Sequence, residues 1–271
     1  LDADLGLALA LDCRDGLRPD LRLLVMSATL ESARVAALIG DAPIIRRGGR
    51  AFPVETRYLG RSAQRVEDDV TAAVIKALGN DPGSILVFLP GQGEILRVAE
   101  RLGEKVRDGD VDIVPLFGAL DPVTQDKAIA PSSGGRRKVV LATSIAETSI
   151  TIDGVSVVID SGLARVPRYE PDIGVTRLAT VRVSRASADQ RRGRAGRTAA
   201  GICYRLWDEP ETQGLVPFAE PEIRNADLSG LLLDCAEWGA PDPQILRWLD
   251  SPPKGPLAAA RGELQAIGAL D

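Results

Sequence analysis

Short runs of valine, isoleucine and leucine recur along the chain and alternate with stretches whose apolar residues follow helical periodicity. Apolar runs that are joined by helices are typical of a parallel sheet covered on both faces. The expected strands lie at 21–29, 54–59, 84–90, 111–117, 138–143, 155–160 and 201–207, and the expected helices at 66–79, 92–105 and 121–130. The sequence therefore predicts an α/β fold built on a parallel sheet with helices on both faces.

Three segments depart from this alternation. Polar and apolar residues alternate over 164–185 around "PDIG", which predicts a β-hairpin inserted into the α/β fold. Residues 215–271 have helical patterns punctuated by prolines and are expected to form a small, mostly helical appendage. The first residues, "LDADLGLALALD", have no basic segment before their apolar positions, so they are interpreted as a helix and not as a signal peptide.

Composition excludes several classes of protein. The 271 residues are 45% hydrophobic but include no run of eighteen apolar residues, which indicates a globular cytoplasmic protein without a membrane span. There is no histidine, so Ser-His-Asp and Cys-His triads and histidine-ligated metal sites are excluded. The three cysteines are far apart in the sequence, as expected in a reducing compartment. Because the net charge is −5, a nucleic-acid site would have to be a local basic patch.

One basic patch stands out in this acidic chain. The stretch "QRRGRAGR" at 190–197 holds four arginines, and Asp189 is the one acid beside it. Arg194 and Arg197 are three residues apart and are expected on one helix face, where two guanidinium groups can clamp a polyphosphate. Glycines are costly inside a helix, and here they are expected to allow close approach. The alternative is a solvated basic helix end or a structural ion-pair site.

Polar loops follow several of the expected strands. They are "SATL" at 27–30, "PGQGE" at 90–94 and the hydroxyl-rich "TSIAETSITIDG" at 143–154. Parallel sheets bind ligands beyond the carboxyl ends of their strands, where hydroxyl and backbone N–H groups suit phosphate oxygens. For any one loop alone, ordinary capping of a helix is the simpler explanation.

Four of these stretches, in this order and spacing, resemble motifs III to VI of the DEAH-box helicases of superfamily 2. They are "MSATL", "FLPGQGEI", "VVLATSIAETSITIDGV" and "QRRGRAGR", and the resemblance to the bacterial HrpB branch runs essentially end to end. The resemblance implies RecA-like lobes and ATP-dependent unwinding of nucleic acid. Its partner would be single-stranded nucleic acid, expected to be RNA. The other reading is a nucleic-acid-binding module without catalysis.

The resemblance also implies roles for individual residues. Gln190 would position the attacking water or the γ-phosphate, Arg194 and Arg197 would act as arginine fingers in catalysis, and Asp153 would contact the nucleotide near its ribose. Residues that would contact nucleic acid are Gly91, Thr143, Thr148, Arg165 and Arg168. Ser27 and Thr29 would couple the state of the nucleotide to strand separation, and the hairpin would act as a strand-separating element.

Two elements of a complete motor are missing from this sequence. There is no Gly-Lys dipeptide, hence no P-loop, and no DExH motif, since there is no histidine. The resemblance makes 1–47 a remnant of a first RecA-like lobe, 48–208 the second lobe and 215–271 the start of a winged-helix region. ATP and Mg²⁺ would serve the complete enzyme, with no metal site in this chain, and the first lobe would be a partner. The isolated chain is expected not to hydrolyse ATP. Residues 1–47 would be mobile, pack on the second lobe or drive dimerisation.

Overall fold

A computed structural model describes residues 1–26, 32–46, 52–106, 109, 111–131, 135–147, 152–170 and 173–270. The chain folds into two compact units. Unit 1 contains residues 1–48, 167–179 and 220–271, and unit 2 contains residues 49–166 and 180–219.

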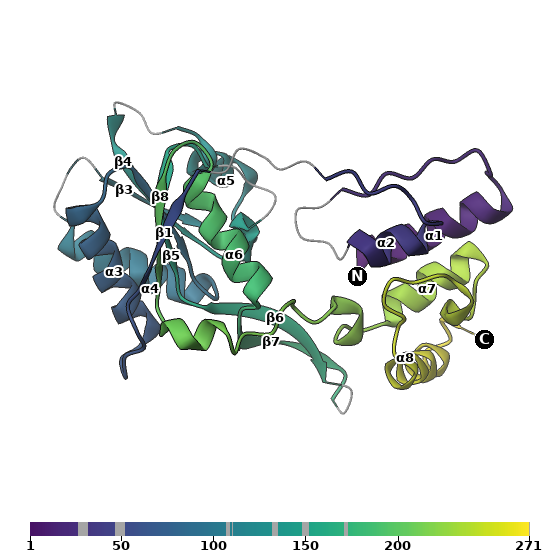
Figure 1. Ribbon diagram of the computed structural model, residues 1–271. Coiled ribbons are helices and arrows are strands. Elements are labelled where there is room, and N and C mark those ends of the chain that lie inside the picture. Colours follow the sequence, from purple (N-terminus) through teal and green to yellow (C-terminus); the bar gives the residue numbers. More distant parts are fainter. Residues whose placement is uncertain are drawn as a thin grey trace. The chain divides into compact units, whose positions relative to one another are not determined.

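Unit 2 is built on a six-stranded sheet in the order β1-β8-β5-β2-β4-β3 (Figure 1). The strands are β1 (Val54–Tyr58), β2 (Ser84–Phe88), β3 (Val111–Leu116), β4 (Arg137–Ala142), β5 (Val155–Asp160) and β8 (Gly201–Arg205). Every neighbouring pair is parallel. Six of the seven strands expected from the sequence are thus confirmed, and so is the parallel α/β fold.

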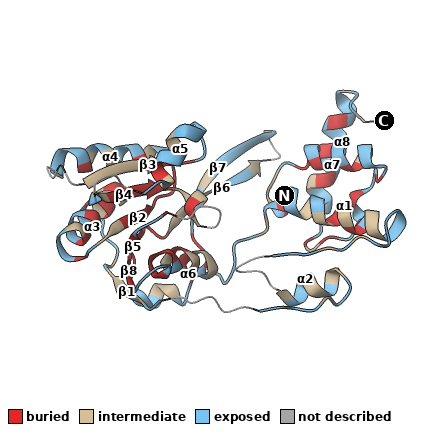
Figure 2. Ribbon diagram, turned by 90° about the horizontal axis from the view of Figure 1, so that it is seen from above, coloured by how far each residue is buried: buried red, intermediate tan, exposed pale blue. Residues whose placement is uncertain are grey.

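Helices cover both faces of this sheet. They are α3 (Val66–Asn80), α4 (Gln92–Lys105), α5 (Pro122–Ile129) and α6 (Arg185–Gly193), with the 3-10 turns η2 (Ser144–Ala146), η3 (Arg194–Gly196) and η4 (Glu209–Thr212). Alternate residues of a strand point to opposite faces, so Val87 packs in the cluster that includes Val74 of α3, and Phe88 in the cluster that includes Ala195 of η3. Figure 2 shows the largely buried central strands β2, β4, β5 and β8 between helices whose outer sides are exposed.

Local sequence fixes where two of these helices begin. The Asp121 side chain accepts a hydrogen bond from the backbone N–H of Thr124, and Pro122 follows it, which is a favourable start for α5. Ser184 caps α6 in the same way by accepting from the backbone N–H of Ser187. The start of α6 matters most here, because this helix leads into the arginine-rich turn.

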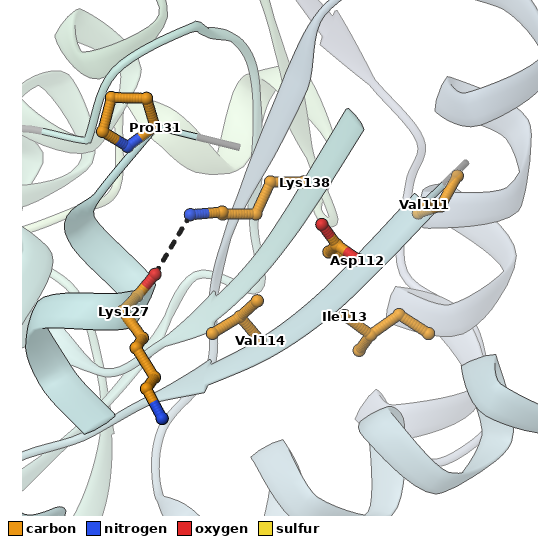
Figure 3. Close-up of a pocket in the computed structure, with 7 residues that line it drawn as sticks. All are labelled: Val111, Asp112, Ile113, Val114, Lys127, Pro131 and Lys138. Atoms are coloured by element: carbon orange, nitrogen blue, oxygen red, sulfur yellow. Dashed lines mark hydrogen bonds between the residues drawn. The ribbon is translucent and has the colours of Figure 1, made fainter. Parts of the chain in front are cut away.

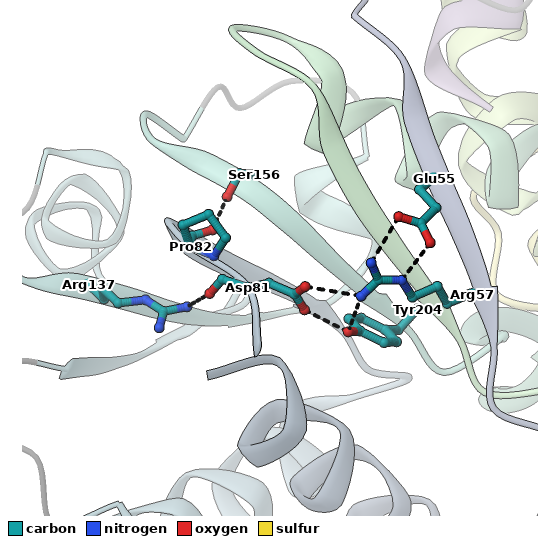
Figure 4. A network of polar contacts seen from close by, with 7 residues as sticks. All are labelled: Glu55, Arg57, Asp81, Pro82, Arg137, Ser156 and Tyr204. Carbon is teal, nitrogen blue, oxygen red and sulfur yellow. Dashed lines mark hydrogen bonds and ion pairs between the residues drawn. The ribbon is translucent and has the colours of Figure 1, made fainter. Parts of the chain in front are cut away.

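Polar contacts hold the connection between α3 and β2 against the neighbouring strands (Figure 4). Arg57 of β1 donates to Asp81 at 3.0 Å and to the Tyr204 hydroxyl of β8 at 2.8 Å, and this hydroxyl donates to Asp81 at 2.6 Å. Arg137 of β4 donates to the carbonyl of Leu78 and to two carbonyls in the connection. Arg137 thereby satisfies a carbonyl that the end of α3 leaves without a helical partner, while Arg57 binds the side chains of Asp81 and Tyr204.

The hairpin expected around "PDIG" is present as β6 (Leu163–Glu170) and β7 (Val175–Arg182), which pair in a sheet of their own. Its outer residues, 167–179, belong to unit 1. There the Tyr169 N–H donates to the carbonyl of Asn225 at 2.8 Å, and the Tyr169 hydroxyl donates to Glu263 at 3.2 Å. Burial and the hydrogen bond to Glu263 raise the pKa of Tyr169.

The rest of unit 1 is helical, as expected for residues 215–271. Its helices are α1 (Asp2–Gly16), α2 (Ser32–Leu38), α7 (Ser229–Trp238) and α8 (Lys254–Ala266), with the 3-10 turns η5 (Glu222–Arg224) and η6 (Pro243–Ile245). Ala8 of α1 is buried in one cluster with Leu231 of α7 and Leu257 of α8. The amino terminus lies 2.6 Å from Glu222, and Trp238 donates to Asp12 at 2.9 Å. Helix α1 therefore packs on the C-terminal helices, a contact that the sequence did not predict.

The strand expected at 21–29 is the one wrong prediction of the sheet. Residues 21–26 are not in a strand, and 27–29 lie outside the described residues. Leu24 and Met26 are 81% and 82% exposed. A strand needs a neighbour for its backbone hydrogen bonds, and no described segment pairs with this one. Among the described residues, no helix has both the length and the apolar character that crossing a membrane requires.

Candidate functional site

The arginine-rich turn lies at the edge of the sheet where the strands begin. Phe52, two residues before β1, donates its N–H to the carbonyl of Gly196 at 2.9 Å. Asp153 is exposed in the turn before β5, and β5 neighbours β8 in the sheet. We call this side of the sheet the amino edge. The sequence placed the whole loop 143–154 beyond the carboxyl ends of the strands, and this is wrong for Asp153, because Asp153 lies two residues before the start of β5.

The two glycines of "GRAG" have different roles. A Cβ atom on Gly196 would lie 2.6 Å from the carbonyl oxygen of Phe52 and 2.7 Å from Cγ2 of Val54, so this position requires glycine for close packing on β1. A Cβ on Gly193 would meet nothing within 4 Å. The expectation of close approach therefore holds at Gly196 and fails at Gly193.

Arg194 and Arg197 are brought together by the change from α6 to a 3-10 turn. Residues three apart are eclipsed in such a turn, so the two arginines extend from the same side. Arg194 is only 7% exposed, whereas Arg197 is exposed. Burial, and then the charge of Arg197, lower the pKa of Arg194 to about 10, with Glu147 acting in the opposite direction. A cation held in this environment favours an anionic ligand such as a triphosphate.

Arg191, from the same arginine cluster, is an internal residue. It is 0% exposed, and its guanidinium donates to Glu147 at 2.7 Å, to Asp160 at 2.8 Å and to the carbonyl of Leu163 at 3.1 Å. It also lies over the ring of Phe88 at 4.9 Å. Burial acts to lower the pKa of Arg191, but the charges of Asp160 and Glu147 outweigh it and the pKa is raised. For this arginine the structural ion-pair alternative was right.

Sequence reasoning did not select Glu147 or Asp160 as the partners of Arg191. Asp160 ends the apolar run of β5 and is 0% exposed, and an acid at the end of a buried strand is a usable signal. Glu147 also accepts from the Ser187 hydroxyl at 2.8 Å. The segment after β4 is thereby tied to α6 through two side chains, Ser187 and Arg191.

A second group of predicted residues lies where the strands end, which we call the carboxyl edge. Gly91 begins α4 just after β2, without a side-chain cap, so the first N–H groups of α4 lack a capping side chain. Arg165 of β6 lies against Gly91 and donates to Glu94 at 3.0 Å, and a Cβ on Gly91 would collide with its guanidinium. Glu94 in turn accepts from Arg97 at 3.0 Å. A helix N-terminus beside a fixed guanidinium suits a phosphate group.

The remaining predicted residues are placed as follows. Thr143 is half-buried after β4, where it begins η2 at the carboxyl edge. Gln190 is half-buried on α6. Arg168 is exposed on the outer part of the hairpin, which belongs to unit 1. Ser27, Thr29 and Thr148 lie outside the described residues.

A separate pocket of about 360 Å³ lies between β3 and the end of α5 (Figure 3). Lys138, which is 5% exposed, donates to the carbonyls of Lys127 and Ala128 at 3.2 and 3.3 Å, and burial lowers its pKa. Its ammonium group therefore caps carbonyl groups at the end of α5. None of the predicted site residues lines this pocket. Over the described part of the chain, no three histidine, cysteine, aspartate or glutamate side chains are grouped to hold a metal ion.

Comparison with known proteins shows which helicases the chain resembles. Residues 69–199 match the helicase conserved C-terminal domain. The ATP-dependent RNA helicase HrpB of Escherichia coli is 50% identical over 100% of this chain, and the chain covers 34% of that protein. A crystal structure of the Escherichia coli DEAH/RHA helicase HrpB superposes with a TM-score of 0.93 over 100% of the chain, which covers 35% of it. Over its whole length the chain is similar to the HrpB-like DEAH-box helicases.

Similarity extends beyond bacteria. The probable ATP-dependent RNA helicase DHR2 of Saccharomyces cerevisiae is 40% identical over 94% of this chain, which covers 36% of that protein. The chain therefore spans about a third of the length of these two curated relatives. By family the relatives are hydrolases that use ATP. The sheet order and the whole-chain superposition confirm the RecA-like α/β fold.

Proposed function

We propose that this chain works as the second RecA-like lobe of an ATP-dependent RNA helicase and contributes to ATP hydrolysis without completing the site. The observation that carries the proposal is the position of Arg194 and Arg197 on one tight turn, with Arg194 buried and its pKa lowered. Two clustered guanidinium groups stabilise the charge that develops on transferred phosphate. A first lobe would supply the P-loop and the acids that hold Mg²⁺, which this sequence lacks.

On the amino edge, the chain's own residues would bind and orient ATP. Arg194 and Arg197 would contact the phosphates, Gln190 would orient the attacking water, and Asp153, exposed before β5, would contact the ribose. ATP bound here supplies the phosphoryl group that is transferred to water. Ser27 and Thr29 would couple the nucleotide state to strand separation.

On the carboxyl edge, the chain would bind single-stranded RNA along its backbone. Gly91 and Arg165 support this proposal because the uncapped start of α4 and a guanidinium fixed by Glu94 lie together. Thr143 and Thr148 would add hydroxyl contacts, and Arg168 would act from the hairpin. Contacts of this kind neutralise phosphate charge and weaken as salt is raised.

ATP turnover, measured with and without oligouridylate, tests the proposal. The chain alone should show none. When a first lobe is supplied in trans, turnover should appear, rise with RNA and fall by about 10³-fold or more in Arg194→Ala, as expected for an arginine finger. Arg136→Ala is a matched control, because Arg136 pairs with Asp112 on β3. Turnover by the chain alone that Arg194→Ala abolishes would overturn the proposal.

The second candidate is a nucleic-acid-binding module without catalysis. The fixed Arg165 beside the start of α4 favours it as well, since these groups would bind RNA whether or not ATP is hydrolysed. The two functions separate in the same experiment. RNA binding without any turnover in the presence of the first lobe would support the binding module.

A further inference from the structure

Arg191 occupies an unusual position between the two edges of the sheet. Its guanidinium contacts Glu147, Asp160 and the carbonyl of Leu163, which all belong to segments at the carboxyl edge. Its backbone, however, lies on α6, only three residues before Arg194. One buried side chain therefore connects the expected RNA contacts with the turn that carries the arginine fingers.

The α6 helix and the turn that follows it are held at two points, one near each edge of the sheet. Beyond its end, Gly196 packs on Phe52 at the amino edge, where no side chain larger than glycine fits. Near the carboxyl edge, Ser187 and Arg191 both bind Glu147. A short helix anchored at two points moves as one body, so displacement of Glu147 would shift the turn that begins at Arg194.

The segments that Arg191 contacts also carry expected RNA contacts. Glu147 follows the turn that Thr143 begins. Leu163, whose carbonyl accepts from Arg191, is two residues before Arg165 on the same strand. RNA bound at Thr143 and Arg165 would therefore act directly on two of the groups that hold Arg191.

We propose that the Glu147–Arg191 pair is a positioning link that carries RNA binding at the carboxyl edge to Arg194 and Arg197 at the amino edge. This inference rests on the proposed function. Arg191 is 0% exposed, so it touches no ligand in this arrangement and acts through α6. A buried pair that served stability alone would hold α6 equally with and without RNA.

Amide hydrogen exchange of the chain, with and without oligouridylate, distinguishes a link from a purely structural pair. In the wild-type protein, RNA should slow exchange in residues 91–95 and also in residues 194–197. Exchange in residues 194–197 should slow by about fivefold or more, which is the lower end of the range for coupling between distinct sites. In Glu147→Gln, protection of 91–95 should remain and protection of 194–197 should be lost.

Two further variants complete the test. Arg192→Gln should behave as wild type, because this neighbouring arginine is partly exposed and its contact with Asp189 is long, at 3.8 Å. If Glu147→Gln does not fold, Arg191→Lys replaces it, since lysine keeps the charge and loses the planar fork that reaches several acceptors.

Each remaining outcome is decisive. Protection of 91–95 without protection of 194–197 in the wild type would overturn the link and leave the proposed function standing. Protection of 194–197 that persists in Glu147→Gln would also overturn it. If RNA protects neither segment, RNA binding itself fails, and the proposed function and the link fall together.

Discussion

Replacement of Arg191 by methionine is expected to destabilise unit 2 by about 3–5 kcal/mol, the cost of removing one partner from a buried ion pair. Methionine fills much of the volume but leaves two acids without their cation. The Asp160 side chain is 0% exposed and that of Glu147 is 13% exposed, so water compensates neither well. The carbonyl of Leu163 also loses a donor. For a unit of this size the melting temperature should fall by about 6–20 °C.

Urea unfolding followed by tryptophan fluorescence measures this loss. Trp207 is the only one of the three tryptophans in unit 2, and it is 1% exposed. In a background with Trp238→Phe and Trp248→Phe, its emission reports on unit 2 alone. The midpoint and the slope of the transition together give the change in the free energy of unfolding.

Two further variants test whether the burial of the ion pair causes this loss of stability. Arg192→Met removes an arginine whose side chain is 41% exposed, and it should cost less than about 1 kcal/mol. Adding Asp160→Asn to Arg191→Met should restore part of the loss, because the stranded charge is removed and an acceptor for the Gly162 N–H remains. If Arg191→Met costs no more than Arg192→Met, the reasoning from burial is refuted.

Three other results are expected. Gly196→Ala should destabilise unit 2 by about 1–3 kcal/mol in urea unfolding, through the clash with Phe52, whereas Gly193→Ala should be neutral or stabilising. Burial raises the pKa of Cys203 from 9.0 to about 12, so the folded state keeps a proton that the unfolded state loses; stability measured against Cys203→Ala should be full below pH 9 and decline as the pH rises toward 12. Arg165→Ala should weaken RNA binding in fluorescence anisotropy and reduce the salt slope by about one; an unchanged slope would contradict a phosphate contact.

Local patterns predicted most of the fold, because the strands of a doubly covered sheet are apolar along their whole length. This is why 84–90 and 155–160 could be placed from sequence and were found within a few residues as β2 and β5. The same pattern failed at 21–26, since a strand also needs a partner that local sequence does not report.

The candidate site, too, was predicted only in part from the sequence. The sequence by itself determined that arginines, glycines and hydroxyls of this kind and order resemble those of DEAH-box helicases. It selected Arg194 and Arg197, but it did not assign Arg191, three residues before Arg194 in the same basic stretch, to ligand binding or to a structural role. Tertiary structure decided between them, because the partners of Arg191 lie 31 and 44 residues away in the chain, at Asp160 and Glu147. It also placed the arginine-rich turn and Asp153 at the amino edge, because that turn packs beside the start of β1 and Asp153 lies two residues before β5. Burial and charge pairing depend on what the fold brings alongside a residue.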